Sequence, residues 1–189
     1  MRVRVSILVA LLVLPSGCSE RAKAPGAPVA DAPSGEPRRD FARAVELQRE
    51  GEHARSVAFF RAAADADPET GGLHLELGKA LHNASIEMGF SGHAVRFEVA
   101  RSQDRARMRR EALAEIRRAI EREPDPGARS YAWFLHSRVL ELSGYVIDAL
   151  ESVERGLELN PSEPTLRAAQ ARLEARLRGG TTRRDATTP

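Results

Sequence analysis

The sequence predicts an all-α protein, a short stack of helical hairpins that ends in one further helix. Charged residues make up 30% of the 189-residue chain and aromatic residues only 5%, a composition typical of solvent-exposed helices. Apolar residues recur at helical spacing between residues 40 and 178. Pro68, Pro124 and Pro161 each close one such stretch, and a proline ends a helix because it cannot continue it.

Residues 1–17 have the organisation of a signal peptide. Two arginines precede an apolar run from Val5 to Leu14. This run of about ten residues is too short to span a bilayer, which needs about 20, but it suits the core of a signal peptide. The single cysteine, Cys18, follows directly, so the chain can form no disulfide of its own.

The segment before Cys18 resembles the lipobox of bacterial lipoproteins, although Pro15 stands where that family usually has leucine. The resemblance implies that Cys18 is acylated and becomes the mature N-terminus. It further implies an exported, membrane-anchored, periplasm-facing protein, and Ser19 favours the outer membrane if two membranes are present. The alternative is an incidental thiol near an ordinary cleavage site. Residues 18–39, rich in Pro, Ala and Gly, are expected to form a flexible tether after Cys18.

The first predicted repeat covers residues 40–69. Asp40 is a candidate cap for its first helix, Gly51 is expected to break the chain, and the second helix is expected at His53–Ala66. In that second helix Ser56, Phe60 and Ala63 follow a small–bulky–small pattern, which lets two helices approach closely.

The second predicted repeat covers residues 72–124 and is longer than a standard repeat of this kind. Its closing proline lies about 56 residues after Pro68, whereas a repeat of this kind has about 34, so about 22 residues are inserted, at residues 83–105. We expect both of its helices to be extended, the second over residues 98–123, with an irregular loop around residues 89–94. A short strand over Val95–Val99 is the alternative.

The third predicted repeat covers residues 130–161, with Trp133 as a core anchor. Residues 163–178 form the expected capping helix, ended by Gly179-Gly180, and residues 179–189 are expected to be a disordered tail.

These repeats resemble the tetratricopeptide repeat. Leu77-Gly78 matches the motif's Leu-Gly pair, whereas His136-Ser137 replaces it in the third repeat. The resemblance implies a helical solenoid that binds proteins, with a groove lined by the first helix of each repeat. The implied groove residues are Phe41, Val45, Arg49, Leu75, Lys79, His82, Asn83, Tyr131, Phe134 and Arg138. The positions at which some such domains clamp a peptide's terminal carboxylate mostly carry Phe41, Val45, Glu76, Tyr131 and Leu135, which does not favour that mode.

The sequence contains none of the catalytic or cofactor-binding motifs considered. The chain has no glycine-rich phosphate loop, nucleophile elbow or second cysteine, so we expect no enzyme activity, no catalytic residues, no cofactor and no metal. Without Arg2 and Arg4 the formal charge falls from +2 to about 0, and the basic run at residues 105–118 lacks interleaved aromatics, so nucleic acid is not an expected partner.

The sequence therefore favours a membrane-anchored interaction or scaffold module of a bacterial cell-envelope complex, with an unknown protein or peptide partner. One alternative is a small-ligand or metal-binding protein, or an enzyme accessory, that uses the inserted segment 83–105 with His82 and His93. Another is a structural spacer with no specific ligand.

Overall fold

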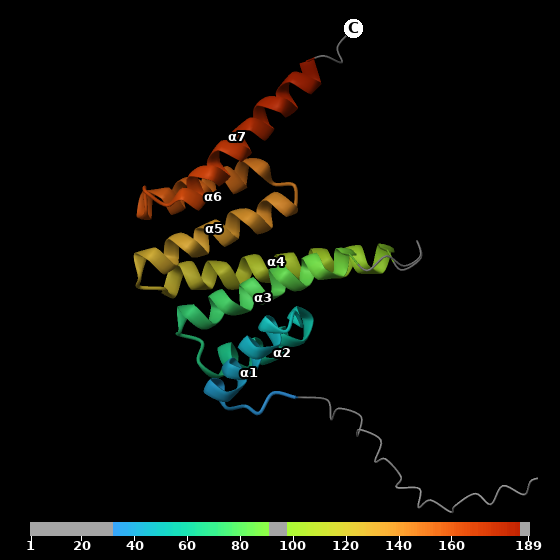
Figure 1. Ribbon diagram of the computed structural model, residues 1–189, viewed down its shortest axis with the longest axis vertical. Helices are drawn as coiled ribbons and strands as arrows, with labels where there is room; N and C mark the ends of the chain where they lie inside the picture. The colour runs from blue at the N-terminus through green and yellow to red at the C-terminus, as the bar shows by residue number, and fades with distance from the viewer. Residues whose placement is uncertain (1–31, 91–97, 186–189) are drawn as a thin grey trace, which may run out of the picture. The chain divides into compact units, whose positions relative to one another are not determined.

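The computed structural model describes residues 32–90 and 98–185, in which seven helices follow one another (Figure 1). Their bounds are α1 (Pro37–Arg49), α2 (His53–Ala66), α3 (Gly71–Phe90), α4 (Glu98–Arg122), α5 (Pro126–Leu142), α6 (Val146–Leu159) and α7 (Pro164–Asp185). The predictions for the signal peptide, Cys18, most of the tether, His93, Val95 and the end of the tail lie outside the described residues.

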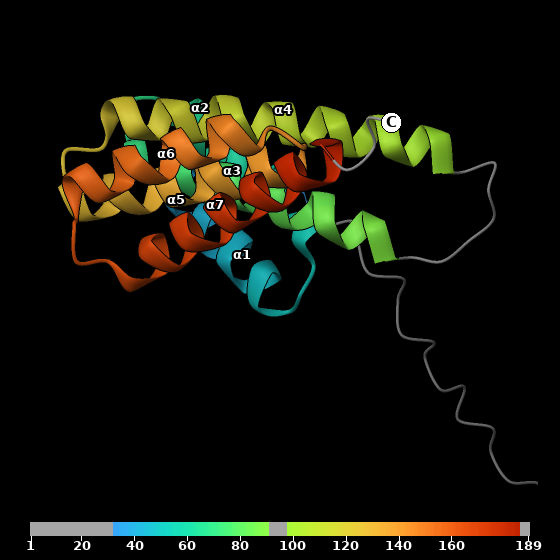
Figure 2. The ribbon, with the colours of Figure 1, turned by 90° about the horizontal axis from the view of Figure 1, so that it is seen from above.

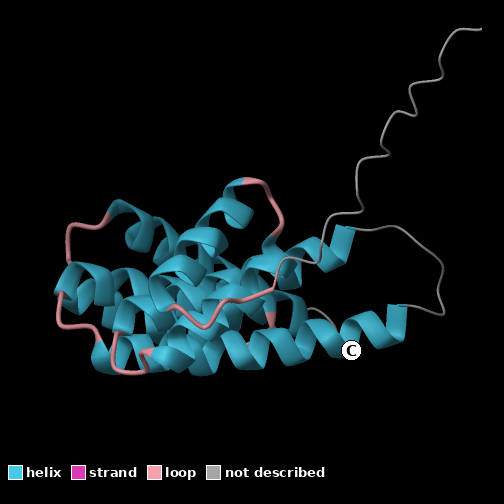
Figure 3. Cartoon of the chain, turned by 90° about the horizontal axis from the view of Figure 1, so that it is seen from below, coloured by secondary structure: helices cyan, strands magenta, loops and turns pink. Residues whose placement is uncertain are grey.

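The helices form three hairpins and a final helix, and each helix packs mainly against its neighbours in the chain. α3 also contacts α5, the first helix of the next hairpin. Figure 3 shows helices and loops, and no strand, in the described part of the chain. The predicted all-α solenoid is therefore confirmed.

The residues that recur from repeat to repeat in the sequence are buried in the core of each hairpin. The second helix of each hairpin contributes three buried residues at the same spacing, and the first helix contributes a buried leucine. These residues are Ser56, Phe60, Ala63 and Leu47 in the first hairpin, Ala112, Ile116, Ala119 and Leu81 in the second, and Ala149, Val153, Gly156 and Leu140 in the third. Because small residues alternate with bulky ones, the two helices of a hairpin pack closely.

The first and third hairpins turn in the same way. Gly51 has a φ of 80° and Gly144 a φ of 89°, a backbone conformation that residues other than glycine rarely adopt. In each turn the backbone N–H of the residue after the glycine donates to the carbonyl oxygen of the residue five positions earlier. These bonds run from Glu52 to Leu47 at 2.8 Å and from Tyr145 to Leu140 at 3.0 Å. This is the bond that closes a Schellman cap.

The second hairpin is the long one, as predicted. α3 has 20 residues and α4 has 25, against 17 and 14 for α5 and α6. Figures 1 and 2 show α3 and α4 running side by side beyond the other hairpins. Gly89 and Phe90 belong to α3 and Val99 to α4, so the expected loop begins later than Gly89, and a strand does not reach Val99.

The start of the domain differs from the prediction. α1 begins at Pro37, inside the segment expected to be tether, because proline suits the first position of a helix. Asp40 is therefore not the N-cap. Its buried carboxylate accepts hydrogen bonds from Ser34 N (2.7 Å), Ser34 Oγ (2.8 Å) and Gly35 N (2.9 Å), which tie the preceding segment to the helix. Burial raises the pKa of Asp40, but these hydrogen bonds outweigh it and hold the pKa below its usual value.

The third hairpin also begins earlier than expected. α5 starts at Pro126, where the Asp125 side chain accepts a hydrogen bond from Ala128 N at 2.7 Å. At the other end, α7 continues through Gly179-Gly180 to Asp185, so the predicted stop at the glycines is wrong. Gly179 has no positive φ, and glycine ends a helix only when it takes that conformation.

Trp133 is not the core anchor that its motif position predicted. It is only partly buried and belongs to neither buried cluster. Its ring packs edge-on against the His136 ring, with centroids 5.7 Å apart. Leu135, Val139 and Leu140 are the large apolar residues of α5 that are buried in the core instead.

Candidate peptide-binding groove

A groove of about 470 Å³ lies between α1, the start of α2 and α3. Its lining combines apolar side chains with amides, a histidine and charged groups of both signs, namely Phe41, Val45, Gln48, Arg49, His53, Glu76, Lys79 and Asn83. Five of these, Phe41, Val45, Arg49, Lys79 and Asn83, are among the groove residues that the sequence predicted. The first helices of two consecutive hairpins thus bring them together.

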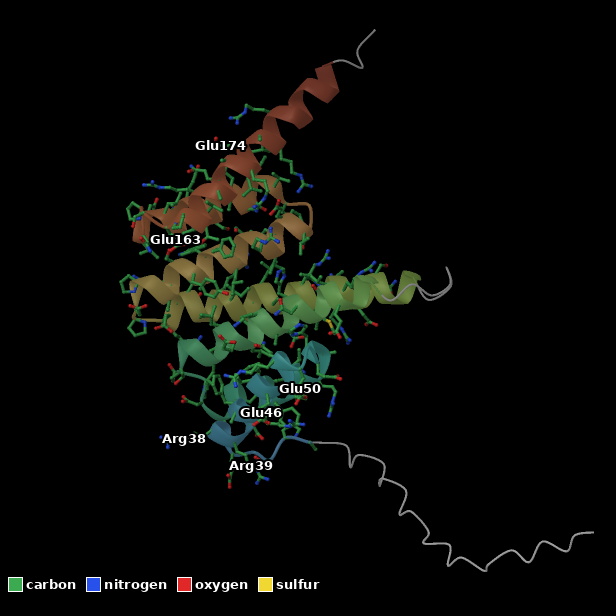
Figure 4. The ribbon with its side chains drawn as sticks, viewed as in Figure 1. Arg38, Arg39, Glu46, Glu50, Glu163 and Glu174 are labelled. Atoms are coloured by element: carbon green, nitrogen blue, oxygen red, sulfur yellow. The ribbon has the colours of Figure 1, made fainter. Side chains whose placement is uncertain are left out.

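The apolar part of the groove is held in place by the core of the first hairpin. Phe41 packs edge-on against Phe60, with ring centroids 5.6 Å apart. Phe60 is fully buried, so the position of Phe41 is fixed by the core of the first hairpin. Phe41 also borders a neighbouring hollow of about 370 Å³, together with Arg38 and Leu73. In Figure 4 Arg38 lies at the outer end of the helix stack.

The polar part of the groove has unused hydrogen-bonding capacity. Gln48 Nε2 and His53 Nδ1 are buried atoms that no described residue bonds. Buried polar atoms are bonded in the great majority of proteins, so these two are candidates for bonding a ligand. On the α3 side, Lys79 Nζ donates to Glu76 Oε2 at 3.1 Å, which neutralises both charges within the groove wall.

A second hollow, of about 110 Å³, holds two more of the predicted residues. Tyr131 and Phe134 stack with centroids 6.2 Å apart beside the turn from α6 to α7. Tyr131 is 44% exposed, a large fraction for an aromatic side chain. Figure 4 shows Glu163, another lining residue, at this end of the helix stack.

Leu75 and His82 do not line the groove. They are 8% and 6% exposed, because the face of α3 that carries them packs against other helices. The structure therefore does not bring these two predicted residues to this groove. Arg138 also lies elsewhere, with Nη1 3.4 Å from Glu141 Oε2. Glu141 is shared with two arginines of α7, Arg172 at 2.9 Å and Arg176 at 3.7 Å.

Two other histidines are structural. His74 is buried and contacts Glu115 Oε2 through Nδ1 at 2.7 Å and Pro68 O through Nε2 at 2.9 Å. The Pro68 carbonyl oxygen can only accept, so Nε2 of His74 donates to it. Arg118 pairs with the other oxygen of Glu115 at 2.6 Å.

His136 has a different set of partners. It accepts a hydrogen bond from Arg117 Nε at 3.3 Å through Nε2, and its Nδ1 lies 2.9 Å from Ser152 Oγ. The Ser152 hydroxyl itself donates to Asp148 O at 2.8 Å, so it must accept from His136. The pKa of His136 is lowered to about 4, chiefly by burial. The Arg117 charge also lowers this pKa, and its effect is larger than the opposite effect of the Asp148 charge.

The described residues contain no group of three or more His, Cys, Asp or Glu side chains placed to hold a metal ion. None of the described helices is long and apolar enough to cross a membrane.

The sequence missed three groove residues. Gln48 lies one turn after Val45, and Glu76 lies one turn before Lys79, so helical spacing could have identified both. His53 belongs to a second helix, and only the geometry of the turn at Gly51 brings it to the groove.

The geometry defines a class of protein, an α-solenoid of stacked helical hairpins. No family model and no curated protein sequence matches the chain. Solved structures do match, and they show that the fold is that of tetratricopeptide-repeat (TPR) domains.

The TPR domain of Arabidopsis OM64 aligns with a TM-score of 0.55 at 12% identity, over 72% of this chain and 93% of that domain. The second TPR domain of human RPAP3, in complex with the HSP70 peptide SGPTIEEVD, gives 0.55 at 15% identity, over 73% of this chain and 98% of that one. The first TPR of Spaghetti (RPAP3), bound to the HSP90 peptide SRMEEVD, gives 0.56 at 16% identity, over 77% and 96%.

Proposed function

We propose that this protein is an interaction module that binds a peptide segment of a partner protein in the groove between α1 and α3. The observation that carries the proposal is the composition of that groove. An apolar floor at Phe41 and Val45 lies beside two buried nitrogens, of Gln48 and His53, that no described residue bonds. Peptide-binding grooves combine apolar pockets with a few placed polar groups in this way.

The groove suggests which features a bound segment has. An apolar side chain would pack on Phe41 and Val45, and backbone carbonyl groups would accept hydrogen bonds from the Gln48 amide and from His53 when its Nδ1 carries hydrogen. Two of the similar domains were solved with peptides that end in EEVD. The corresponding clamp positions here mostly carry Phe41, Val45, Glu76, Tyr131 and Leu135, so we propose recognition of an internal segment instead of a terminal carboxylate.

A site-specific crosslinking experiment tests the groove. A photoreactive amino acid is placed at Val45 in one variant of the full chain and at Arg155 in another. Arg155 is an exposed residue of α6 that pairs with Glu158 and lies outside the groove. We expect the Val45 probe to give a discrete adduct, reduced by Phe41→Ala, that the Arg155 probe does not give. Identical adduct patterns from the two positions would contradict the proposed groove.

We further propose that the module acts at a bacterial cell envelope, anchored through acylated Cys18. The support is the arrangement of Arg2 and Arg4, the apolar run and the lone cysteine. Cys18→Ala should move the protein from the membrane fraction to the released fraction in the expressing cell. A Cys18→Ala variant that stays in the membrane fraction would refute the anchor but leave the groove untouched.

A further inference from the structure

Apart from the groove, two buried nitrogen atoms have no hydrogen-bond partner among the described residues. They belong to facing turns of α3 and α4, one turn along from the contact of Gly78 with Ala112. They are Nδ1 of His82, on α3, and Nε of Arg109, on α4. His82 is 6% exposed, and the charge of Arg109 acts on it directly. Buried polar atoms are normally bonded to protein, to ordered water or to a bound ion, so a pair of unbonded ones on facing turns indicates a binding position.

The surroundings of this pair are cationic. The charges that act on His82 are those of Arg138, on α5, and Arg109, and the charge that acts on Arg109 is that of Arg105. Arg109 Nη1 donates to Leu142 O at 2.8 Å, which fixes the guanidinium and leaves Nε directed elsewhere.

Among the described residues, the carboxylate paired with Arg138 is that of Glu141, and it is already shared. Glu141 lies 3.4 Å from Arg138, but it also pairs with Arg172 and Arg176. One negative charge therefore serves three arginines. Burial lowers the pKa of His82 to about 4, and Arg138 and Arg109 add to this effect. Like charges at a buried site are unfavourable unless an opposite charge is bound there.

We propose that the junction of α3, α4 and α5 binds one anionic oxygen group, a carboxylate or a phosphate. His82 Nδ1–H and Arg109 Nε–H donate hydrogen bonds to it, and Arg105 and Arg138 supply the balancing charge. The group belongs either to a free anion or to an acidic side chain of a partner. The site uses none of the residues that line the groove between α1 and α3, although the sequence had placed His82 and Arg138 in a groove, so it does not rest on the proposed peptide binding.

The experiment follows the histidine rings of the full chain by NMR over a pH titration. Inorganic phosphate is compared with sodium chloride at equal ionic strength. A bound anion should raise the pKa of His82 by about one to two units, because an opposite charge close by favours the protonated ring. His136 is the internal control, since its ring nitrogens are both bonded within the protein.

A second arm identifies the source of the anion. A short peptide of alternating leucine and glutamate is compared with the same peptide carrying glutamine. A response to phosphate assigns the site to a free anion, and a response only to the glutamate peptide assigns it to a partner's carboxylate. If neither probe moves the His82 titration, the proposal is wrong.

Two variants make the result specific. Arg109→Gln should abolish the response, and Arg155→Gln, on the outside of α6, should retain it. If Arg109→Gln does not fold, Arg105→Gln replaces it and should weaken the response at least several-fold. A response that survives these variants would also overturn the proposal. The Val45 crosslink is scored separately, so failure of the groove and failure of this site are distinguishable.

Discussion

At the positions of the motif's Leu-Gly pair, the second and third hairpins join their two helices by different chemistry. In the second, Gly78 allows α3 to approach α4 so closely that an added Cβ would lie 2.6 Å from Ile116 Cγ1. In the third, His136 and Ser137 occupy the corresponding places, and the hairpin is joined by the hydrogen bonds from Arg117 through His136 and Ser152 to Asp148. One hairpin is fixed by shape and the other by a chain of donors and acceptors.

The difference shows how a repeat motif tolerates substitution. The backbone path requires only that the two helices pack closely without leaving unbonded polar groups. Glycine meets the requirement by having no side chain. In the third hairpin Ser137 stands in the place of Gly78 and donates its hydroxyl to Phe134 O of its own helix at 2.7 Å. His136 stands in the place of Leu77 and finds its acceptor in Ser152, on α6, at 2.9 Å. The hydrogen-bonded contact in the third hairpin depends on pH, whereas the glycine contact in the second does not.

The largest effect should come from the buried contact between His74 of α3 and Glu115 of α4. Glu115→Ala removes the buried partner of His74 and Arg118, and unfolding in urea should show a loss of about 3 kcal/mol or more, as for other broken buried pairs. Glu154→Ala, at an exposed position of α6, is the control and should change stability by less than about 0.5 kcal/mol. A loss as small as the control's would show that His74 and Glu115 do not hold the hairpin.

The polar third hairpin should weaken in acid. The folded-state pKa of His136 is about 4, below the unfolded value of 6.5, so the unfolded chain binds the proton first as the pH falls. The stability contributed by neutral His136 is present above about pH 6.5 and is lost between about pH 6.5 and 4, to a total on the order of 3 kcal/mol.

His136→Gln should flatten this part of the stability–pH curve. Its remaining slope reports the other groups, including His82, whose pKa is lowered in the same way. An unchanged slope in the variant would show that His136 is not the titrating group. Chemical denaturation at a series of pH values measures both curves.

The close contact at Gly78 in the second hairpin should not tolerate added volume. Gly78→Ala should destabilise the protein by about 1–3 kcal/mol, because the new methyl meets Ile116 Cγ1 and also the Ala112 carbonyl oxygen at 3.3 Å. The matched control is Gly179→Ala, where an added Cβ meets nothing within 4 Å, and this change should be neutral or slightly stabilising. Equal melting temperatures for the two variants would rule out the close approach.

The smallest of the four effects should be at Trp133. A fully buried tryptophan would cost about 3–5 kcal/mol on truncation to alanine. Trp133 is only partly buried and packs on the His136 ring, so we expect Trp133→Ala to cost about 1–2 kcal/mol. A loss equal to that of Glu115→Ala would return Trp133 to the role that its motif position suggested.

The sequence by itself determined the helices and the repeat register. Helical periodicity, Gly51, Gly144 and the closing prolines are local signals, and they placed α2 and the long α4 to within a residue. It also identified five residues of the α1–α3 groove, because the exposed face of a helix follows from residue spacing.

Only the tertiary structure decided which of the remaining predicted residues line the groove. Leu75 and His82 have the spacing of groove residues, but α3 contacts helices on more than one side, and burial there depends on those neighbours. The structure also decided the roles of the histidines. A side chain's protonation and bonding are set by atoms distant in sequence, as Glu115 is from His74 and Ser152 is from His136.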